Sequence, residues 1–262
     1  MPDGTQVDLG HAMITMVEPT RDPERLREYN RWYEHDHAYS GVLVGPWAFA
    51  YRRWVATSAL KDLRAPNPSS VADPVTNGTF IAFYWYLKDR IDEHFAWAFP
   101  QTQWLTEQGR MNGEREHVST SLYDFRGAVN RTGWSVPPEI ALDHPYDGLV
   151  VAWLDRSPDA AYDDVETWVR SEWLPELIEG TPIAQVLLFA PRDFPGAPGT
   201  SIGAGDKLCC AFLLQCDPRD AWSAHFSDFA EDVSKSGLAT LGLVAPFIPV
   251  VPGTDTYLDD LW

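Results

Sequence analysis

Apolar and polar positions follow two periods along the chain, and these periods predict strands and helices in a repeated order. Helical spacing of the apolar residues covers about 23–40, 90–109, 161–179 and 218–235. Asp22-Pro23 and Asp217-Pro218 precede two of these helices, as expected where an aspartate caps a helix and proline occupies its first position. Apolar stretches typical of strands occupy about 11–17, 47–55, 79–88, 118–126, 148–154, 183–190, 207–216 and 242–251.

The two series of elements form an internal repeat. Trp32 aligns with Trp168 at an offset of 136 residues, and the apolar stretch 81–87 aligns with 210–216 at an offset of 129. Each half therefore has the order β-α-β-β-α-β, which is the ferredoxin-like order. The sequence divides into a first repeat, a proline-containing linker and a second repeat, at residues 1–129, 130–147 and 148–262.

The middle strands of both halves are apolar on both of their alternating faces. This holds for residues 80–87 and again for 208–214. Each four-stranded antiparallel sheet must then be covered on both sides. Helices cover one side, and the other repeat's sheet is the available cover for the second. The predicted fold class is α+β, with two tandem β-α-β-β-α-β repeats packed as an intrachain pseudo-dimeric α/β barrel.

Composition narrows the classes of partner. Twenty Lys and Arg residues against 38 Asp and Glu give a net charge of −18, which disfavours nucleic acid and anionic membrane surfaces. We find no apolar run long enough to span a bilayer and no leader-like start in residues 1–6, so we expect a soluble cytoplasmic protein. Cys209, Cys210 and Cys216 lie in one apolar segment and are expected to be reduced core residues.

A local motif in the first half resembles a known superfamily. Trp32 and His37 lie on a predicted helix, followed by Gly45-Pro46 and a strand that contains Phe49 to Arg53. This arrangement is similar to the dimeric α/β barrel superfamily, and more narrowly to its EthD-like members, as a tandem fused repeat. The resemblance implies a pocket between helices and sheet in each half. It also implies metal-free cyclisation, isomerisation, dehydration or oxygenation of carbonyl, lactone or polyketide-like compounds, although some relatives bind haem.

The two halves differ in the residues that can do chemistry. At the positions aligned with His35, His37 and Tyr51, the second half has Ser171, Trp173 and Leu187. A duplicated fold needs both halves for packing but only one for a reaction. We therefore expect one functional pocket, in the first half, where most of the histidines lie: His11, His35, His37, His94 and His117.

The candidate catalytic residues are His37, Tyr51, His35 and Asp36. Helical geometry places Tyr33 and His37 on one face and turns His35 elsewhere. His37 would act as general acid/base, Asp36 or Glu34 would hold its tautomer, and a tyrosine would donate a hydrogen bond to a carbonyl oxygen. The alternative is that His37 only caps the end of its helix.

The candidate substrate-binding residues are mostly aromatic, in a chain with 12 Trp, 10 Tyr and 12 Phe. Because Arg52 and Arg53 are adjacent on a strand, only one of them faces the pocket. In the alternative interpretation the aromatic side chains only fill the core and the arginines reach the rim. The expected set is Trp32, Tyr33, Arg53, Tyr84, Trp85 and His94.

The sequence therefore favours a cofactor-independent enzyme of the lyase, isomerase or cyclase type, acting on a hydrophobic oxygenated small molecule, as a monomer or homodimer. Two alternatives remain: a small-molecule-binding or stress-type protein without turnover, and a haem- or oxygen-dependent enzyme in which His94 or His225 is the axial ligand. No metal is expected at His35 and His37, because two side chains two residues apart on a helix converge poorly on one ion.

Overall fold

Eight strands pair edge to edge into one closed antiparallel barrel in the computed structural model, which describes residues 7–196, 202–205 and 207–262. Residues 1–6, on which the expectation about a leader rests, and the end of the loop after Pro191 lie outside this range. The strands are β1 (Leu9–Pro19), β2 (Ala48–Val55), β3 (Phe80–Leu87), β4 (Arg115–Asn130), β5 (Gly148–Arg156), β6 (Ile183–Arg192), β7 (Lys207–Leu214) and β8 (Ala239–Pro249).

The strand order around the barrel is β1-β3-β2-β8-β5-β7-β6-β4. Within it, β4-β1-β3-β2 is the ferredoxin-like order of one repeat, and β8-β5-β7-β6 is the same order in the other. The repeats join at two seams, β4 with β6 and β2 with β8, and the second seam pairs only Trp54 and Val55 with Pro249 and Ile248. The predicted fold class is therefore confirmed, with the two sheets closed into a barrel rather than stacked.

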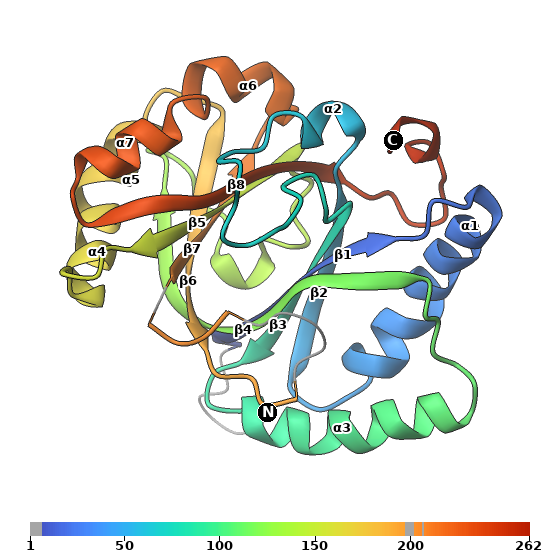
Figure 1. Cartoon of the computed structure of the whole chain (residues 1–262). Coiled ribbons are helices and arrows are strands. Elements are labelled where there is room, and N and C mark those ends of the chain that lie inside the picture. The colour runs from blue at the N-terminus through green and yellow to red at the C-terminus, as the bar shows by residue number, and fades with distance from the viewer. Residues whose placement is uncertain (1–6, 197–201, 206) are drawn as a thin grey trace.

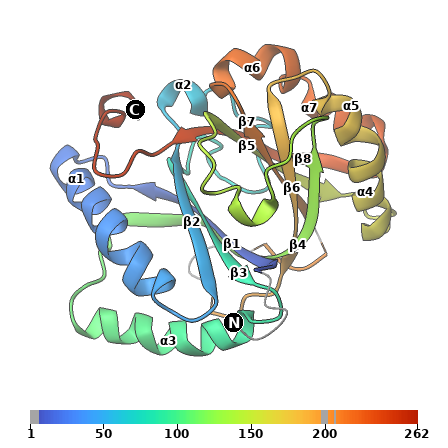
Figure 2. The same ribbon diagram turned by 180° about the vertical axis from the view of Figure 1, so that it is seen from behind.

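The helices cover the outside of the barrel in two groups (Figures 1 and 2). Those of the first repeat lie on one side and those of the second on the other, while the short α2 lies at one end. Among the described residues no helix is long and apolar enough to cross a membrane. The helices are α1 (Pro23–Trp32), α2 (Ser58–Lys61), α3 (Ile91–Glu107), α4 (Tyr162–Trp168), α5 (Leu174–Ile178), α6 (Pro218–His225) and α7 (Phe229–Lys235), with short 3₁₀ turns at Pro138–Ile140 and Leu258–Asp260.

The strands that are apolar on both faces explain why the barrel has a core inside and helices packed outside. On β3, Trp85 and its alternate neighbours point into the barrel and join its core, whereas Tyr84 and its alternate neighbours point out under the helices. β7 divides in the same way between the barrel core and the core beneath α6 and α7. Three apolar cores result: one inside the barrel and one outside it in each repeat.

The helices differ from prediction in three places, and in one of them the predicted helix 161–179 is divided into α4 and α5 by a π-helical turn at Val169–Trp173. The predicted helix 23–40 ends as α-helix at Trp32 and continues as π-helical turns at Tyr33–His37 and Tyr39–Leu43. The predicted helix 218–235 is two helices, because Phe226 to Asp228 separate α6 from α7. The caps are as predicted: Asp22 accepts hydrogen bonds from two backbone amides of α1, and Asp217 accepts one in α6.

The strand alignment between the repeats is wrong by one residue. The offset of 129 pairs Tyr84 with Leu213, but Tyr84 faces the helices and Leu213 faces the barrel interior; Phe212 occupies the equivalent position. Tyr51 likewise faces the helices, whereas Leu187 faces the interior. Because both faces of these strands are apolar, no polar position in the sequence fixes the register.

The fully buried Trp85 belongs to the barrel core, so its loss is expected to act on stability. We expect Trp85→Ala to lower the free energy of unfolding by about 3–5 kcal/mol, the range for truncating a buried aromatic residue. Urea denaturation measures this change. Trp104→Ala, at a site that is 45% exposed, is the control and should shift the unfolding free energy by less than about 0.5 kcal/mol.

Candidate functional site

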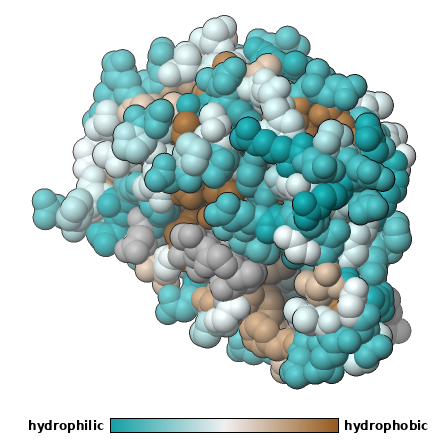
Figure 3. Space-filling model, turned by 45° about the vertical axis from the view of Figure 1, so that its right-hand side comes forward, coloured by the Kyte–Doolittle hydropathy of each residue, from teal (hydrophilic) through white to brown (hydrophobic). Residues whose placement is uncertain are grey.

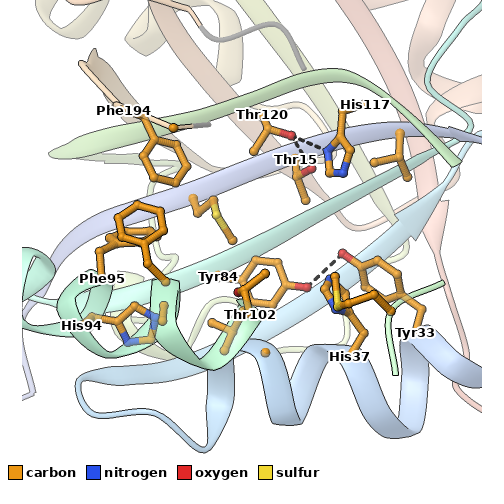
Figure 4. A pocket seen from close by; sticks show the side chains of 18 of the residues that line it. Thr15, Tyr33, His37, Tyr84, His94, Phe95, Thr102, His117, Thr120 and Phe194 are labelled. Carbon is orange, nitrogen blue, oxygen red and sulfur yellow. Dashed lines mark hydrogen bonds between the residues drawn. The ribbon is translucent and has the colours of Figure 1, made fainter. Parts of the chain in front are cut away.

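A cavity with a mostly apolar lining lies in the first repeat, between the outer face of the sheet and the helical segments that cover it. Its volume is about 260 Å³. Figure 4 shows aromatic side chains gathered at one end, near Phe95 and Phe194, and hydroxyl and imidazole groups at the other, near His37 and His117. In the space-filling view, apolar side chains gather in the lower half of the molecule, around the residues drawn in grey (Figure 3).

A π-helical turn places His37 in this cavity. A π-helix bonds residue i to i+5, so side chains five apart lie over each other. The ring of His37 accordingly stacks on Trp32, with centroids 4.4 Å apart and an interplanar angle of 20°. The ring of Tyr33 meets His37 edge-on at 5.1 Å. Gly41 lies beside the imidazole, where an added Cβ atom would be in van der Waals contact with His37 Nδ1 at 3.4 Å.

His37 is neutral at physiological pH. Burial, with Arg115 as the next contribution, lowers the pKa of His37 to about 3. Its Nδ1 is buried and has no hydrogen-bond partner among the described residues, so this nitrogen does not cap the helix end. The expected tautomer partners are engaged elsewhere: Asp36 pairs with Arg110, and Glu34 Oε2 accepts from the backbone amide of Gly253 at 2.8 Å.

A hydrogen-bonded chain faces His37 across the cavity (Figure 4). Arg115 Nε donates to His117 Nε2 at 3.2 Å, so His117 Nδ1 carries the proton and donates to Thr120 Oγ1 at 2.8 Å. Thr120 Oγ1 is in turn 2.8 Å from Thr15 Oγ1. Burial, aided by Arg115, lowers the pKa of His117 to about 4. His117, Thr120 and Thr15 thus present neutral donors and acceptors to the cavity, beside the charged guanidinium of Arg115.

Two tyrosines supply hydroxyl groups beside His37. The hydroxyls of Tyr33 and Tyr84 are 2.9 Å apart, so one of them donates to the other and the second proton is free for another acceptor. Tyr51 stacks on Tyr84 with ring centroids 4.9 Å apart, but its own side chain lines a different cavity. Burial raises the pKa of Tyr84 well above its ordinary value, which keeps this phenol protonated.

The far end of the cavity contains His94 and Tyr86. His94 Nδ1 donates to the carbonyl oxygen of Pro46 at 2.6 Å, which leaves the lone pair on Nε2. Neither His94 Nε2 nor the Tyr86 hydroxyl has a hydrogen-bond partner within the described part of the chain. Their rings are 4.6 Å apart. With His37, the lining therefore includes three side chains with unpartnered buried polar atoms.

The remaining expected site residues lie elsewhere. His35 is exposed, because its side chain leaves the other side of the helical segment. Trp85 lies in the barrel core, since β3 turns alternate residues to opposite faces. Arg53 faces the helices, as one of the two arginines had to, but together with Tyr51 it lines a second cavity. Trp32 lies behind His37, and its Nε1 donates to the carbonyl oxygen of Arg110.

The equivalent space in the second repeat is filled. Trp168 and Trp173 stack across a matching π-helical turn at 5.4 Å, as Trp32 and His37 do in the first repeat. Trp173 then packs edge-on against Phe212 and Phe229. The indole that replaces the imidazole thus occupies the region where the first repeat is hollow.

Several lining residues were missed from the sequence. His117 was counted among the first-repeat histidines but given no role, because it lies on the long β4, which carries no recognisable motif. Simple alternation along β4 groups His117 with Ser119 and Ser121, but the register shift opposite Met16 and Val17 turns these serines to the barrel interior and puts Thr120 on the face of His117. The other missed residues include Met13, Thr15, Phe95, Thr120 and Phe194.

Comparison with known proteins defines the fold. No family model matches the sequence, and no curated protein matches it. Among solved structures, an anthrone oxidase-like protein has a TM-score of 0.53 at 9% identity and covers 93% of this chain and 92% of its own. The chain has the fold of the dimeric α/β barrel proteins.

Two other structural neighbours carry DyP names, and one of them is a complex with heme. DypB of Rhodococcus jostii, in complex with heme, has a TM-score of 0.53 at 8% identity and covers 94% of this chain and 95% of its own. The encapsulated DyP-type peroxidase of Mycobacterium smegmatis has a TM-score of 0.53 at 12% identity and covers 99% of this chain and 97% of its own. At these identities the likeness concerns the fold.

The lining and the volume of the first cavity show whether a haem would fit there. His94 has the arrangement of an axial ligand, with Nδ1 bonded to a carbonyl and Nε2 free. The cavity is too small for a haem. Its volume of about 260 Å³ is below the range of roughly 300–1,000 Å³ for pockets that hold drug-sized molecules, and a porphyrin is larger than most drug-sized molecules. The described residues therefore do not fit the macrocycle. They also contain no group of three or more His, Cys, Asp or Glu side chains suited to a metal ion.

The lowered histidine pKa values predict a pH dependence of stability. An unfolded histidine takes up a proton near pH ~6.5, whereas His37 in the folded protein does so only near pH 3, so stability falls as the pH drops from about 6.5 toward 3. His37→Gln removes this linkage. Between about pH 7.5 and about pH 5, the variant should lose about 2 kcal/mol less unfolding free energy than the wild type, since one pKa unit equals about 1.4 kcal/mol. Urea titrations at the two pH values measure the difference, and equal losses in both proteins would contradict it.

Proposed function

We propose that the first-repeat cavity is the active site of a cofactor-independent enzyme of the lyase, isomerase or cyclase type. It transfers a proton on a hydrophobic, oxygenated small molecule. The observation that carries the proposal is the neutral, partly buried imidazole of His37 in contact with Tyr33, whose hydroxyl is hydrogen-bonded to that of Tyr84, at one end of an apolar cavity. A base and a hydrogen-bond donor close together in a dry site are the elements that enolisation needs.

The proposed reaction is a proton transfer through His37. His37 accepts a proton from a carbon that is next to a carbonyl group or conjugated with it, and the electron pair of the broken C–H bond moves, through the conjugated bonds where these intervene, onto the carbonyl oxygen. The free proton of the Tyr33–Tyr84 pair hydrogen-bonds that oxygen. The imidazolium then returns the proton to another carbon in an isomerisation, or to a departing hydroxyl in an elimination. The low pKa of His37 favours its neutral, proton-accepting form and requires a substrate with an acidic C–H bond.

The cavity indicates the size and character of the substrate. Its mostly apolar lining suits a planar hydrophobic molecule, with Phe95 and Phe194 against the ring system and His37 at the oxygenated end. One structural neighbour is named an anthrone oxidase-like protein. Anthrone has a methylene group activated by a conjugated carbonyl, and is therefore a suitable probe for proton abstraction in this cavity.

The catalytic residues are proposed to reside in residues 1–129, joined by the linker 130–147 to a largely structural repeat at 148–262, whose matching space Trp173 fills and which adds Phe194 and Gly196 to the lining of the first cavity. The likeness of the segment from Trp32 to Arg53 to EthD-like proteins supports the same interpretation. Because the second repeat supplies the sheet that a partner chain supplies in two-chain barrels, we propose that the protein acts as a monomer or homodimer, in the cytoplasm.

The test is exchange of the anthrone methylene protons in D₂O without oxygen, followed by NMR. The wild type should accelerate exchange over buffer, and His37→Gln should reduce the enzymatic rate on the order of 10²-fold or more, because the proton acceptor is lost. His35→Gln changes an exposed histidine on the same segment and should leave the rate within about twofold.

Two results would contradict the proposal. A folded His37→Gln variant with wild-type exchange would remove the assignment of the base. A hydrophobic compound that co-purifies unaltered, with no exchange on anthrone or 2-tetralone, would favour a binding protein without turnover.

A further inference from the structure

A second cavity of about 340 Å³ lies in the first repeat, separated from the first by two stacked tyrosines. Tyr33 lines the first cavity and Tyr51 lines the second, and their ring centroids are 6.3 Å apart. Val250, from the segment after β8, also lines the second cavity, as does Leu142 from the segment between the repeats. Both halves of the chain and their connection therefore meet there.

Arg53 lines this cavity as a buried cation. Its side chain is 3% exposed and lies over three aromatic rings, with the guanidinium carbon 3.7 Å from the ring centroid of Phe80, 4.4 Å from that of Tyr33 and 5.3 Å from that of Tyr29. These faces stabilise a positive charge but accept no conventional hydrogen bonds. Among the residues that the structure describes, no carboxylate pairs with Arg53 and none of its three guanidinium nitrogens makes a hydrogen bond of good geometry; the hydroxyl of Tyr29, also unpartnered, is the neutral acceptor beside it.

The other buried cationic side chains in the described ranges donate hydrogen bonds to backbone carbonyl groups. Arg64 donates to the carbonyl oxygens of Val75, Asn77 and Gly78, and Lys61 donates to the carbonyl oxygen of Leu261. Buried charged groups in folded proteins are normally paired or hydrogen-bonded in this way. Arg53 has the aromatic surroundings of a binding site without the acceptor that would complete it.

We propose that the second cavity binds a small hydrophobic carboxylic acid, whose carboxylate pairs with Arg53. A planar carboxylate matches the fork of the guanidinium and accepts two of its hydrogen bonds. Leu142, Val250 and the ring of Tyr51 line the space that the apolar part of the ligand would occupy.

The charges around the cavity favour a monoanion over a phosphate. Arg52 also lines the cavity, but its guanidinium donates to the carbonyl oxygens of Leu142 and His144. Glu34 and Asp143 line it too and would repel a dianion. Glu34 Oε1 is buried without a partner in the described part of the chain, so a ligand that also carries a hydroxyl or amino donor would satisfy both groups.

Calorimetric titration with benzoate and benzamide tests the proposal on the full-length protein. The two probes have nearly the same shape and differ in charge. Benzoate should bind the wild type at least about 10-fold more tightly than benzamide, because a charged pair forms only with the acid. Arg53→Met keeps the length of the side chain without its charge and should lose at least about 10-fold in benzoate affinity.

Arg64→Met is the matched control, since it removes the other buried arginine, whose two terminal guanidinium nitrogens are hydrogen-bonded within the fold. It should retain benzoate binding but lower the thermal midpoint, whereas ligand-free Arg53→Met should not lower it. Arg53→Lys, which keeps the charge without the planar fork, should bind benzoate with intermediate affinity.

Equal affinity of the wild type for both probes, no detectable benzoate binding, or unchanged benzoate affinity in Arg53→Met would each overturn the proposal. The readout is affinity rather than turnover. A failure of benzoate to bind would therefore not contradict the proposed proton transfer at His37, and an absence of proton transfer would not contradict the carboxylate site at Arg53.

Discussion

The structure depends on strands that are apolar on both faces. A sheet of this kind cannot leave either side in water, so one face must meet helices and the other must meet a second sheet. In this chain the second sheet comes from the same polypeptide, and two seams close eight strands into a barrel. The barrel core, which contains Trp85 and Trp153, then fixes the outer faces on which each repeat carries its helices.

The outer faces of the two repeats share one helix geometry, but one repeat has a cavity there and the other is filled by side chains. Both repeats replace one α-helical turn by a π-helical turn, and both stack a side chain on the tryptophan five residues before it. In the second repeat the stacked residue is Trp173, whose indole packs on Phe212 and Phe229. In the first repeat it is His37, which lines a cavity. A single change in side-chain size and polarity at one equivalent position thus accompanies the difference between a filled and a hollow repeat.

The hollow repeat keeps its polar groups neutral. Burial lowers the pKa values of His37 and His117 and raises that of Tyr84, so the first cavity holds imidazoles and phenols without charge. The only buried guanidinium of this repeat that lines a cavity within the described residues, Arg53, lies on the other side of the Tyr33–Tyr51 stack. Each cavity nevertheless has a guanidinium in its lining: Arg115 in the first, which donates to His117, and Arg52 and Arg53 in the second.

The sequence by itself determined the order of elements, the repeat, the helix caps at Asp22 and Asp217, the two-faced strands and the contact between Tyr33 and His37. Each of these follows from local periodicity or from neighbours a few residues apart. Only the tertiary structure decided the strand register between the repeats, because apolar residues on both faces of β3 and β7 permit either alignment. It also decided that Trp85 faces the barrel and that Tyr51 and Arg53 belong to a second cavity. The role of His117 could not be predicted from the sequence either. Its partner Thr120 meets Thr15 through the pairing of β4 with β1, and these two threonines are more than 100 residues apart in the chain.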